Sequence, residues 1–234
     1  MQKHVERVKE LLHATYADQR TQEWLDLRDN MITASDVASA IGENRYENED
    51  SFVRKKVLKT KWGGNAATAH GTLLEPYVRD LYDLKYNKKS HEIGVVQHRV
   101  HKFLGGSPDG ITEDGLLIEI KCPLTRKIDK KVPAYYIPQI QLLLEVLDLE
   151  ECDFIEFKPK TDLVEEQFVV KRVVRDREWF AKYLPVMERV WRRIEYGRQF
   201  GLCEIEHEDS IREICCEIVN EEQSLPSQSE VSKV

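Results

Sequence analysis

The chain has 234 residues, of which 41% are hydrophobic and 33% charged, so it can bury one sizeable core and is not disordered throughout. Its net charge of −7 by itself argues against a polyanionic partner. However, residues 203–234 hold nine acidic and two basic side chains, whereas residues 1–202 hold 33 of each sign. The body is therefore neutral, and its basic groups can still gather locally.

The cysteines and the N-terminal residues bear on the compartment. The cysteines are an odd set of five without regular spacing, which favours reduced thiols over a disulfide framework. The first residues, MQKHVERVKELL, interleave charged and apolar side chains, unlike a signal peptide or a membrane span. We therefore expect a cytoplasmic or nuclear protein with no membrane association.

The N-terminal part is predicted to be helical. Apolar residues recur at helical spacing in VERVKELLHATY, with basic side chains on the other face. The segment TQEWLDLRDNMITASDVASAIG is typical of a short helix, a connector, and a second helix that starts near Thr33 and ends at Gly42. Residues 50–60 are expected to form a further, basic helix.

The middle and C-terminal parts alternate between helical and β-type patterns. After Gly63 and Gly64, the segment HGTLLEPYVRDLYDLKY predicts a long helix. From Glu92 onward the β-type runs are IGVVQHRV, HKFLGGS, LLIEIK, CDFIEFK and EQFVVKRVV. A helix at about 134–147 separates the third and fourth runs, and another follows the last. This order favours an α/β layered fold with a mixed sheet.

We expect a single domain over residues 1–202, followed by an acidic tail, 203–234, that is expected to be flexible. The domain divides into N-terminal helices at about 1–62, a core at about 66–175 and a C-terminal helix at about 176–198. Within the tail, four residues could be taken for a zinc set, although adjacent cysteines fit the usual ligand spacing poorly: Cys203, His207, Cys215 and Cys216.

The candidate chemistry centres on Asp109, Glu119 and Lys121. Glu119 and Lys121 are two residues apart on a predicted strand, so both emerge on one face, while the flanking isoleucines point to the other. Asp109 lies in GGSPDGI, where the glycines and the proline favour a tight turn. A hairpin from 104 to 121 would bring Asp109 beside Glu119.

Two carboxylates suit Mg²⁺, which prefers oxygen ligands and keeps several waters. The lysine ammonium can orient an attacking water or, with a lowered pKa, help to deprotonate it. This combination favours phosphodiester hydrolysis over acyl or glycosyl chemistry. Each fragment alone has a plainer explanation, a solvated Glu-x-Lys pair and a PDG turn. Together, ten positions apart, Asp109 and Glu119 match the PD-(D/E)XK nuclease signature.

Five ordered motifs resemble the YqaJ-type viral recombinase family, which is related to the phage lambda exonuclease: RTQEWLDLRDNMITASDVASAIG, HGTLLEPYVRDLY, FLGGSPDGI, GLLIEIKCP and AYYIPQIQ. The resemblance runs from about Trp24 to Tyr196. It implies a restriction-endonuclease-like core, a central mixed β-sheet flanked by helices. It also implies Mg²⁺ dependence, with Mn²⁺ as a substitute, and processing of double-stranded DNA ends in viral or phage recombination or replication.

The activity expected from the resemblance is a 5′-to-3′ exonuclease. A structure-selective endonuclease on the same core and a non-catalytic DNA-binding module are the alternatives. The resemblance also implies a single-strand annealing protein as a partner and a homo-oligomer.

The resemblance assigns Asp109 and Glu119 as metal ligands, with the Ile120 carbonyl as a third, and Lys121 as the catalytic lysine. Glu75, in HGTLLEP, matches a helix carboxylate that joins the site. An ordinary surface glutamate near a helix start is the plainer explanation for Glu75.

Gln139, in YYIPQ, matches a glutamine that supports the lysine and the bound water. Tyr136 lies one turn earlier on the same face as a supporting residue, and Gln141 is the less favoured choice for this role. Pro138 departs from the family pattern and indicates that the helix starts there or is kinked.

Arg28, Thr33 and Ser35 form a second candidate set. Thr33 can cap the helix that follows, with Asp36 at the capping-box position, and this alone could explain TASD. A helix N-terminus is also an anion site, and an arginine can hold a phosphate bidentately. The matching Arg and Ser of the related exonucleases contact the terminal phosphate, so the resemblance assigns this set to DNA 5′-phosphate binding.

The remaining reactive or aromatic residues are expected to pack. Cys122 follows the strand with no histidine or base near it in sequence, so a small packing residue is favoured over a nucleophile. Trp24, Trp179 and Trp191 are most simply core aromatics.

Overall fold

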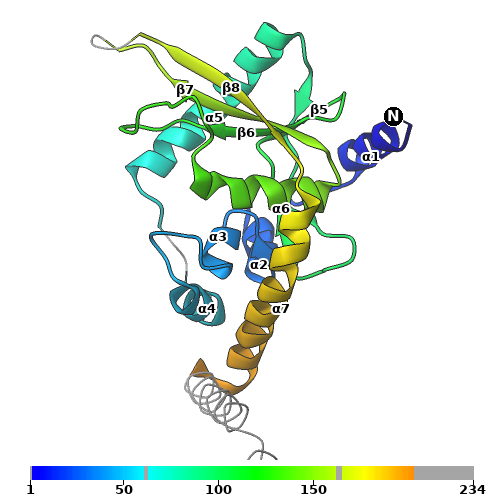
Figure 1. Ribbon diagram of the computed structural model, residues 1–234, viewed down its shortest axis with the longest axis vertical. Coiled ribbons are helices and arrows are strands. Elements are labelled where there is room, and N and C mark those ends of the chain that lie inside the picture. The colour runs from blue at the N-terminus through cyan, green and yellow to red at the C-terminus, as the bar shows by residue number, and fades with distance from the viewer. Residues whose placement is uncertain (1, 61–62, 162–164, 203–234) are drawn as a thin grey trace, which may run out of the picture.

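The computed structural model describes residues 2–60, 63–161 and 165–202 (Figure 1). The tail 203–234 and its candidate zinc set lie outside these residues. The helices are α1 (Gln2–His13), α2 (Gln22–Asp29), α3 (Val37–Ala40), α4 (Glu49–Leu58), α5 (Ala66–Tyr86), the 3₁₀ turn η1 (Ala134–Tyr136), α6 (Ile137–Leu147) and α7 (Arg177–Phe200). The strands are β1 (Ile32–Thr33), β2 (Ser90–His91), β3 (Val96–Gln97), β4 (Leu104–Gly106), β5 (Gly110–Thr112), β6 (Leu117–Lys121), β7 (Glu151–Lys158) and β8 (Gln167–Val174).

The described strands form two sheets. The larger is mixed, with the order β2-β5-β6-β7-β8, and only its β6–β7 pair is parallel. The smaller has the order β1-β4-β3, with β1 parallel to β4. The predicted hairpin from 104 to 121 is therefore wrong, because β4 pairs with β1 and β3 and the hairpin is β5–β6 alone.

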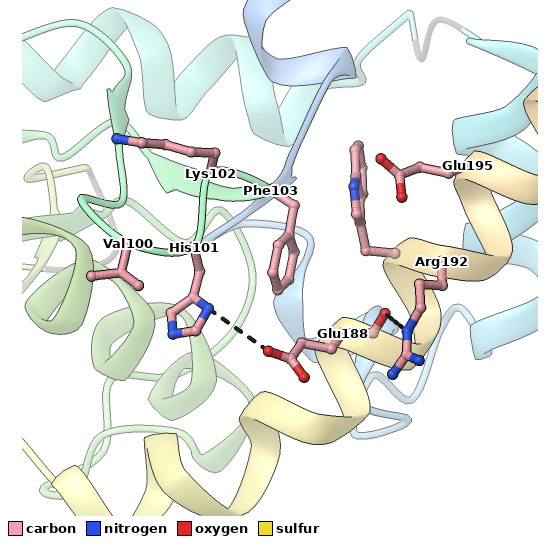
Figure 2. Close-up of a pocket in the computed structure, with 8 residues that line it drawn as sticks. Val100, His101, Lys102, Phe103, Glu188, Arg192 and Glu195 are labelled. Atoms are coloured by element: carbon pink, nitrogen blue, oxygen red, sulfur yellow. Dashed lines mark hydrogen bonds and ion pairs between the residues drawn. The ribbon is translucent and has the colours of Figure 1, made fainter.

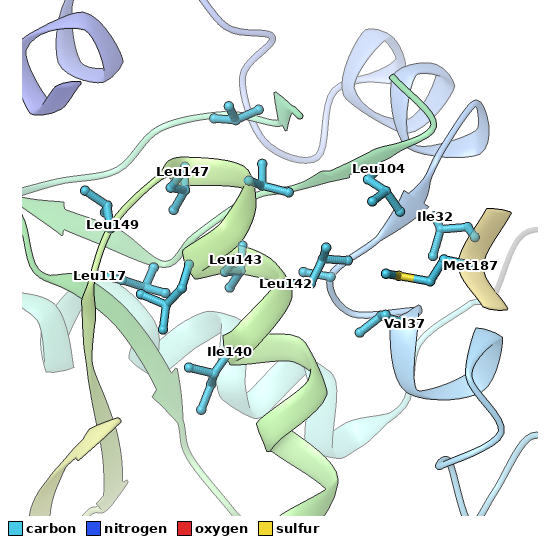
Figure 3. Packing of buried hydrophobic residues seen from close by; sticks show 14 of the residues in the cluster. Ile32, Val37, Leu104, Leu117, Ile140, Leu142, Leu143, Leu147, Leu149 and Met187 are labelled. Atoms are coloured by element: carbon cyan, nitrogen blue, oxygen red, sulfur yellow. The ribbon is translucent and has the colours of Figure 1, made fainter. Parts of the chain in front are cut away.

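Helices α5 and α6 cover opposite faces of the larger sheet (Figure 1). Ile118 of β6 packs in one cluster with Val78 of α5. Leu117 packs in the larger cluster with Leu143 of α6 (Figure 3). Because side chains alternate along a strand, Glu119 faces α6. The predicted α/β layered fold with a mixed sheet is confirmed.

The helix predicted between Thr33 and Gly42 is present as α3, but its predicted start near Thr33 is wrong. Thr33 ends β1, where the N–H of Ile32 donates to the Phe103 carbonyl at 2.7 Å and that of Ala34 to the Gly105 carbonyl at 2.8 Å. The short helix α3 begins only at Val37. The side chain of Thr33 is buried and is not a helix cap.

The N-terminal helices and α7 pack around the smaller sheet. Met187 and Val190 of α7 join Val37 of α3 and Phe52 of α4 in the larger core cluster. The aromatic residues Trp179 and Trp191 of α7 are partly buried against this cluster, as expected. None of the described helices combines the length and the apolar character that a membrane span needs.

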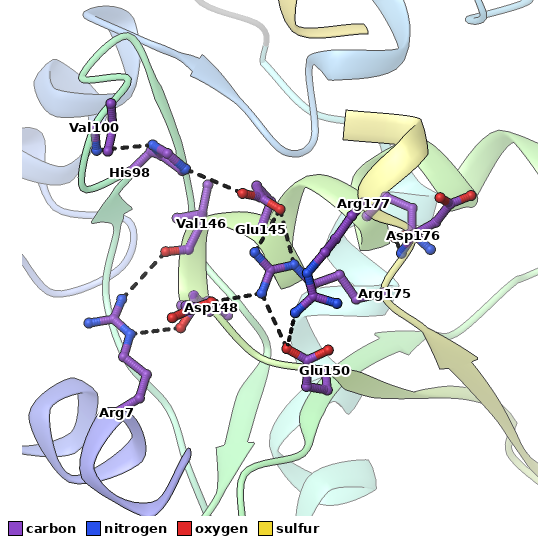
Figure 4. Close-up of polar contacts among 12 residues, drawn as sticks. Arg7, His98, Val100, Glu145, Val146, Asp148, Glu150, Arg175, Asp176 and Arg177 are labelled. Atoms are coloured by element: carbon purple, nitrogen blue, oxygen red, sulfur yellow. Dashed lines mark hydrogen bonds and ion pairs between the residues drawn. The ribbon is translucent and has the colours of Figure 1, made fainter. Parts of the chain in front are cut away.

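Polar contacts fix the C-terminal end of α6 (Figure 4). Arg7 of α1 donates to the carbonyls of Val146 at 3.4 Å and Leu147 at 2.8 Å, the last two residues of α6. These hydrogen bonds satisfy carbonyl groups that the end of a helix leaves unpaired. Arg175, between β8 and α7, pairs with Glu145 and with Asp148, both at 2.7 Å. These contacts hold α6, whose first turn carries Gln139, in place against the sheet.

Candidate active site

Glu119 lies at the centre of the predicted site. Its side chain is completely buried, and its Oε1 accepts hydrogen bonds from Lys121 Nζ and, at 2.6 Å, from Gln139 Nε2. Its Oε2 is buried and has no hydrogen-bond partner among the described residues. A buried carboxylate oxygen without a donor costs stability, so this atom is suited to a cation.

Asp109 occupies the turn between β4 and β5, next to the end of β6. Its Oδ2 accepts the backbone N–H of Ile120 at 2.7 Å. Arg79 of α5 donates to the Asp109 carbonyl at 2.7 Å and pairs with Glu92 at 3.0 Å. The turn is thus tied both to the strand and to α5, and Asp109 lies beside the strand segment that carries Glu119.

Glu75 of α5 lies at the edge of this group. Its carboxylate pairs with Arg20 at 3.4 Å, and it is close enough to Asp109 and Glu119 for their charges to interact. The structure therefore brings Glu75 near the site, with its side chain paired to an arginine that the sequence did not single out.

Burial and mutual repulsion perturb the three carboxyl groups. Burial, followed by the charge of Asp109, raises the pKa of Glu119 to about 8 and that of Glu75 to about 7. Burial also raises the pKa of Asp109, although Lys121 acts against this shift. Charges this close favour protonation unless a cation is present. The donor set therefore fits a divalent metal ion.

Lys121 remains an ammonium in this arrangement. Burial would lower its pKa, but the carboxylates of Glu119 and Asp109 outweigh burial and raise the pKa above its usual value. Its Nζ lies 5.3 Å from the centroid of the Tyr136 ring, within the range of a cation–π contact. A raised pKa is compatible with the first role expected for Lys121, orienting the attacking water, and not with the second, which required a lowered pKa.

Gln139 and Gln141 point to different places. Gln139, in the first turn of α6, reaches the central carboxylate as described above. Gln141 is buried, donates to the Val174 carbonyl at 2.9 Å and accepts the N–H of Asp176 at 2.7 Å. It joins α6 to the β8–α7 connection and lies outside the site. Pro138 stands in the first turn of the helix, as its position in the sequence indicated.

The structure also brings Arg28, Thr33 and Ser35 together. Arg28 donates to Ser35 Oγ at 2.8 Å, and the hydroxyls of Thr33 and Ser35 are 3.0 Å apart. The guanidinium of Arg28 lies 4.3 Å from the Trp24 ring centroid, and Trp24 Nε1 donates to Ser107 Oγ at 2.8 Å. Trp24 is partly buried and, contrary to expectation, is not among the core aromatics. It links this set to the turn that carries the predicted ligand Asp109.

An ion pair that is largely buried holds the turn after β1. Asp36 accepts from Thr33 Oγ1 at 2.8 Å and pairs with Lys56 of α4 at 2.8 Å. Lys56 also donates to the carbonyls of Arg28 and Met31, both at 3.0 Å. Burial acts to raise the pKa of Asp36, but Lys56 outweighs it and lowers the pKa. An ion pair, and not a helix start at Thr33, positions these side chains.

Arg79 and Lys56 are structural residues that the sequence analysis missed. Arg79 follows Glu75 by four residues on one helix, and such neighbours share a face, so this spacing could have revealed it. Lys56 is far in sequence from the carbonyls that it contacts, and no local pattern reveals it. Cys122 is buried, and burial, followed by the charge of Asp109, raises its pKa to about 12, which is consistent with a packing thiol.

A cavity of about 450 Å³ lies between the β3–β4 turn and α7 (Figure 2). The rings of Phe103 and Trp191 stack at its wall with centroids 6.2 Å apart, and His101 faces Glu188 at 3.8 Å. None of the predicted site residues lines this cavity.

Two viral proteins are similar in sequence to this chain. An uncharacterized protein of Acanthamoeba polyphaga mimivirus is 30% identical over 160 residues, which cover 60% of this chain and 29% of that protein. A protein of African swine fever virus is 32% identical over 155 residues, which cover 53% of this chain and 44% of that protein. The chain thus spans less than half the length of these relatives.

Solved structures of bacterial proteins share the fold. An alkaline exonuclease, LHK-Exo, from Laribacter hongkongensis has a TM-score of 0.67 at 27% identity, over 83% of this chain and all of the other. The same exonuclease in complex with dAMP gives 0.65 at 28%, with the same coverage. A phage related exonuclease from Haemophilus somnus gives 0.58 at 15%, over 74% of this chain and 96% of the other. The family model of the YqaJ-like viral recombinase domain matches residues 23–150. The chain belongs to the YqaJ-like viral recombinase domain family.

Proposed function

We propose that this chain is a metal-dependent deoxyribonuclease that hydrolyses double-stranded DNA from its ends, with 5′-to-3′ polarity. Mg²⁺ is the proposed cofactor and Mn²⁺ its substitute. The similarity to an alkaline exonuclease over most of both chains supports the activity. The observation that carries the proposal is the buried, unpartnered Oε2 of Glu119 beside two further carboxyl groups.

Asp109 and Glu119 would hold the metal ion, with the Ile120 carbonyl as a third oxygen. Among the described residues, no three or more His, Cys, Asp or Glu side chains converge closely enough to form a site alone. This suits Mg²⁺, which binds through one or two carboxylates and keeps several waters. When bound, the metal supplies positive charge for activating a water and stabilising charge on the phosphoryl oxygens.

The chain's own residues supply the remaining functions. Lys121, an ammonium on the same strand face as Glu119, orients the attacking water and faces the charge that builds on the phosphate. Gln139 holds Glu119 Oε1 from α6. Arg79 donates to the Asp109 carbonyl and so holds the turn that carries Asp109. Glu75 adds a third carboxylate at the edge of the site.

The proposed polarity rests on Arg28, Thr33 and Ser35. Because β1 and β4 are parallel, Ser35 and the Ser107–Asp109 turn leave the smaller sheet at the same edge. An arginine and two hydroxyls can hold the oxygens of a terminal phosphate. A 5′-phosphate held there would place the adjoining phosphodiester toward Asp109 and Lys121.

Digestion of linear and covalently closed circular duplexes, side by side with Mg²⁺ or with EDTA, tests the proposal. We expect mononucleotide release from the linear DNA only, and only with the metal. Equal cutting of closed circles would establish the endonuclease alternative. DNA binding without cleavage of either substrate, in Mg²⁺ or Mn²⁺, would establish a non-catalytic DNA-binding module.

Membership of a recombinase family supports two further proposals. A single-strand annealing protein would act on the strand that the nuclease exposes, and several copies of the chain would assemble into a homo-oligomer. Sedimentation of the full chain, alone and with an annealing protein, tests both. A monomer that does not bind the annealing protein would contradict them.

A further inference from the structure

Glu156 of β7 is a completely buried carboxylate outside the site described above. It lies opposite Lys121 in the parallel register of β6 and β7. Its Oε1 pairs with Arg126 and its Oε2 with Lys171 of β8. A buried charge is stable only when it is well paired, so these three residues form one unit, here called the Glu156 triad.

The Glu156 triad contacts and holds the loop of residues 122–133, which joins β6 to η1. Arg126 belongs to this loop and also donates to the Lys127 carbonyl at 2.9 Å. Lys171, beneath the loop, donates to the Lys131 carbonyl at 3.0 Å. The loop is therefore anchored at two points to a buried anion, although it contains no helix or strand.

The loop is strongly basic. It contains Arg126 and three lysines against a single acidic residue, Asp129. Glu156 neutralises Arg126, whereas the side chains of Lys127, Lys130 and Lys131 are exposed and form no ion pair within the part of the chain that the structure describes. Three lysine ammonium groups are therefore exposed on a loop whose conformation is held by the buried Glu156 triad.

The position of the loop connects it to the candidate active site. It begins directly after Lys121 and ends at the turn that carries Tyr136 and leads into Gln139. Exposed lysines that border a phosphodiester-cleaving centre suit the sugar-phosphate backbone of a nucleic acid, which carries a dense row of negative charges.

We propose that the loop 122–133 binds the nucleic-acid backbone through Lys127, Lys130 and Lys131, and that Glu156 is a positioning residue that holds this loop beside the active site. This inference rests on the proposed nuclease function. It adds a specific substrate-binding surface and a buried network that maintains it.

The first test replaces the three lysines together by glutamine. The dissociation constant for a duplex is measured by fluorescence anisotropy in EDTA across a salt series, and KM and kcat are measured with Mg²⁺. We expect KM and the dissociation constant to rise about tenfold or more, and the salt slope to fall by about two to three. The kcat should stay within about twofold, because the lysines bind the ground state and the transition state alike.

The matched control replaces three exposed lysines of other surfaces, Lys9, Lys102 and Lys182, and loses the same net charge. We expect a clearly smaller rise in KM from this variant. Equal effects of the two triple variants would mean that only overall charge matters, and would overturn the proposed surface.

The second test uses Glu156→Gln, for which an effect of net charge and a loss of loop positioning predict changes in KM of opposite sign. Removing a negative charge should tighten DNA binding if only electrostatics act. If Glu156 positions the loop, KM should instead rise severalfold, with kcat preserved and with faster tryptic cleavage within the loop. An unchanged or lower KM would overturn the positioning role.

Arg126→Gln covers the case in which Glu156→Gln fails to fold, because it leaves the buried Glu156–Lys171 pair intact. Lys127→Gln is its control and loses the same charge from the adjacent position. A larger rise in KM for Arg126→Gln supports positioning, and equal rises contradict it. A wild-type protein that cleaves no DNA would contradict the proposed function. The anisotropy measurements, made without metal, test DNA binding by the loop independently of cleavage, so the two failures can be distinguished.

Discussion

The two oxygens of Glu119 have different surroundings, and this difference connects the site's electrostatics to its proposed chemistry. One oxygen accepts from Lys121 and Gln139, and the other is buried without a donor. Near neutral pH, the raised pKa values of Glu119 and Glu75 make the metal-free site costly to ionise. A divalent cation at this position would remove that cost.

The metal-free protein should therefore lose stability as the pH rises. The ordinary pKa of 4.5 is raised to about 8 for Glu119 and to about 7 for Glu75, so between these values the folded state binds more protons than the unfolded state. Stability then falls with pH across this window. Thermal melts in EDTA from about pH 5 to about pH 8 should show this fall, and Glu119→Gln should reduce it. Melting temperatures that rise equally in both proteins would contradict the account.

Replacing Lys121 by alanine should nearly abolish cleavage while metal binding remains. The carboxylates stay in place, but the transition state loses a preorganised cation, which costs on the order of 100-fold in kcat or more. Lys160→Ala, an exposed lysine paired with Glu165, is the control and should be unaffected. Wild-type turnover of Lys121→Ala would remove this residue from the mechanism.

The sequence predicted the placement of several single residues. Glu119 and Lys121 lie on β6, and Asp109 directly precedes its partner strand β5, so strand alternation and tight-turn rules indicated this grouping although the predicted hairpin boundaries were wrong. Gln139 was found only through the family resemblance, because its contact with Glu119 crosses from a helix to a strand. The roles of these residues remain predictions, which the variants described here test.

At the scale of elements, the position of α6 depends on its packing against the larger sheet. Leu143 is completely buried in the larger core cluster, so Leu143→Ala should cost about 2–5 kcal/mol of unfolding free energy. Urea denaturation measures this loss. Leu84→Ala, at a side chain 81% exposed, should change stability by less than about 0.5 kcal/mol.

We infer one domain over residues 1–202, because the larger core cluster contains residues from α1 to α7. Tryptophan fluorescence and far-ultraviolet circular dichroism should therefore give coincident transitions, whereas separate transitions would contradict it.

The parallel pairing of β1 with β4 places the proposed phosphate-binding set beside the proposed metal site. Arg28→Ala should remove most of the preference for a 5′-phosphorylated over a 5′-hydroxyl duplex, because a charge-assisted contact contributes roughly 1.5–3 kcal/mol, or about ten- to a hundredfold. Digestion rates of the two substrates measure the effect. Arg99→Ala, an exposed arginine paired with Glu10, is the control. An enzyme that ignores end phosphorylation would contradict the assigned polarity.

The long helices and most strands followed from periodicity, including the short strands β3 and β4, but β1, β2 and β5 did not. β1 has two residues and exists because β4, far along the chain, offers a parallel partner. Local patterning in MITASDVASAIG therefore predicted a helix start at Thr33, where the structure has the end of a strand. The smaller sheet depends on this long-range β1–β4 pair, which leaves no periodic signal in the sequence, whereas its β3–β4 pair joins consecutive strands.

At the scale of the whole molecule, the fold collects residues from distant segments at the strand ends. Asp109 comes from the β4–β5 turn, Glu119 from β6, Gln139 from α6, Glu75 from α5, and the Arg28 set from the segment around β1. Each lies on or beside an element packed into one of two hydrophobic clusters. Such support from packed elements is what a preorganised site needs.

The most direct test of the central claim measures the release of acid-soluble nucleotides from a linear 5′-phosphorylated duplex. Wild-type protein and Asp109→Asn are compared in Mg²⁺ and in EDTA. We expect release by the wild type with Mg²⁺ and none in EDTA. Asp109→Asn should be inactive at the same Mg²⁺ concentration and partly restored by excess Mg²⁺ or Mn²⁺, because the substitution weakens metal binding. Release that persists in EDTA, or an unchanged metal dependence in Asp109→Asn, would contradict the claim that this carboxylate holds a catalytic metal ion.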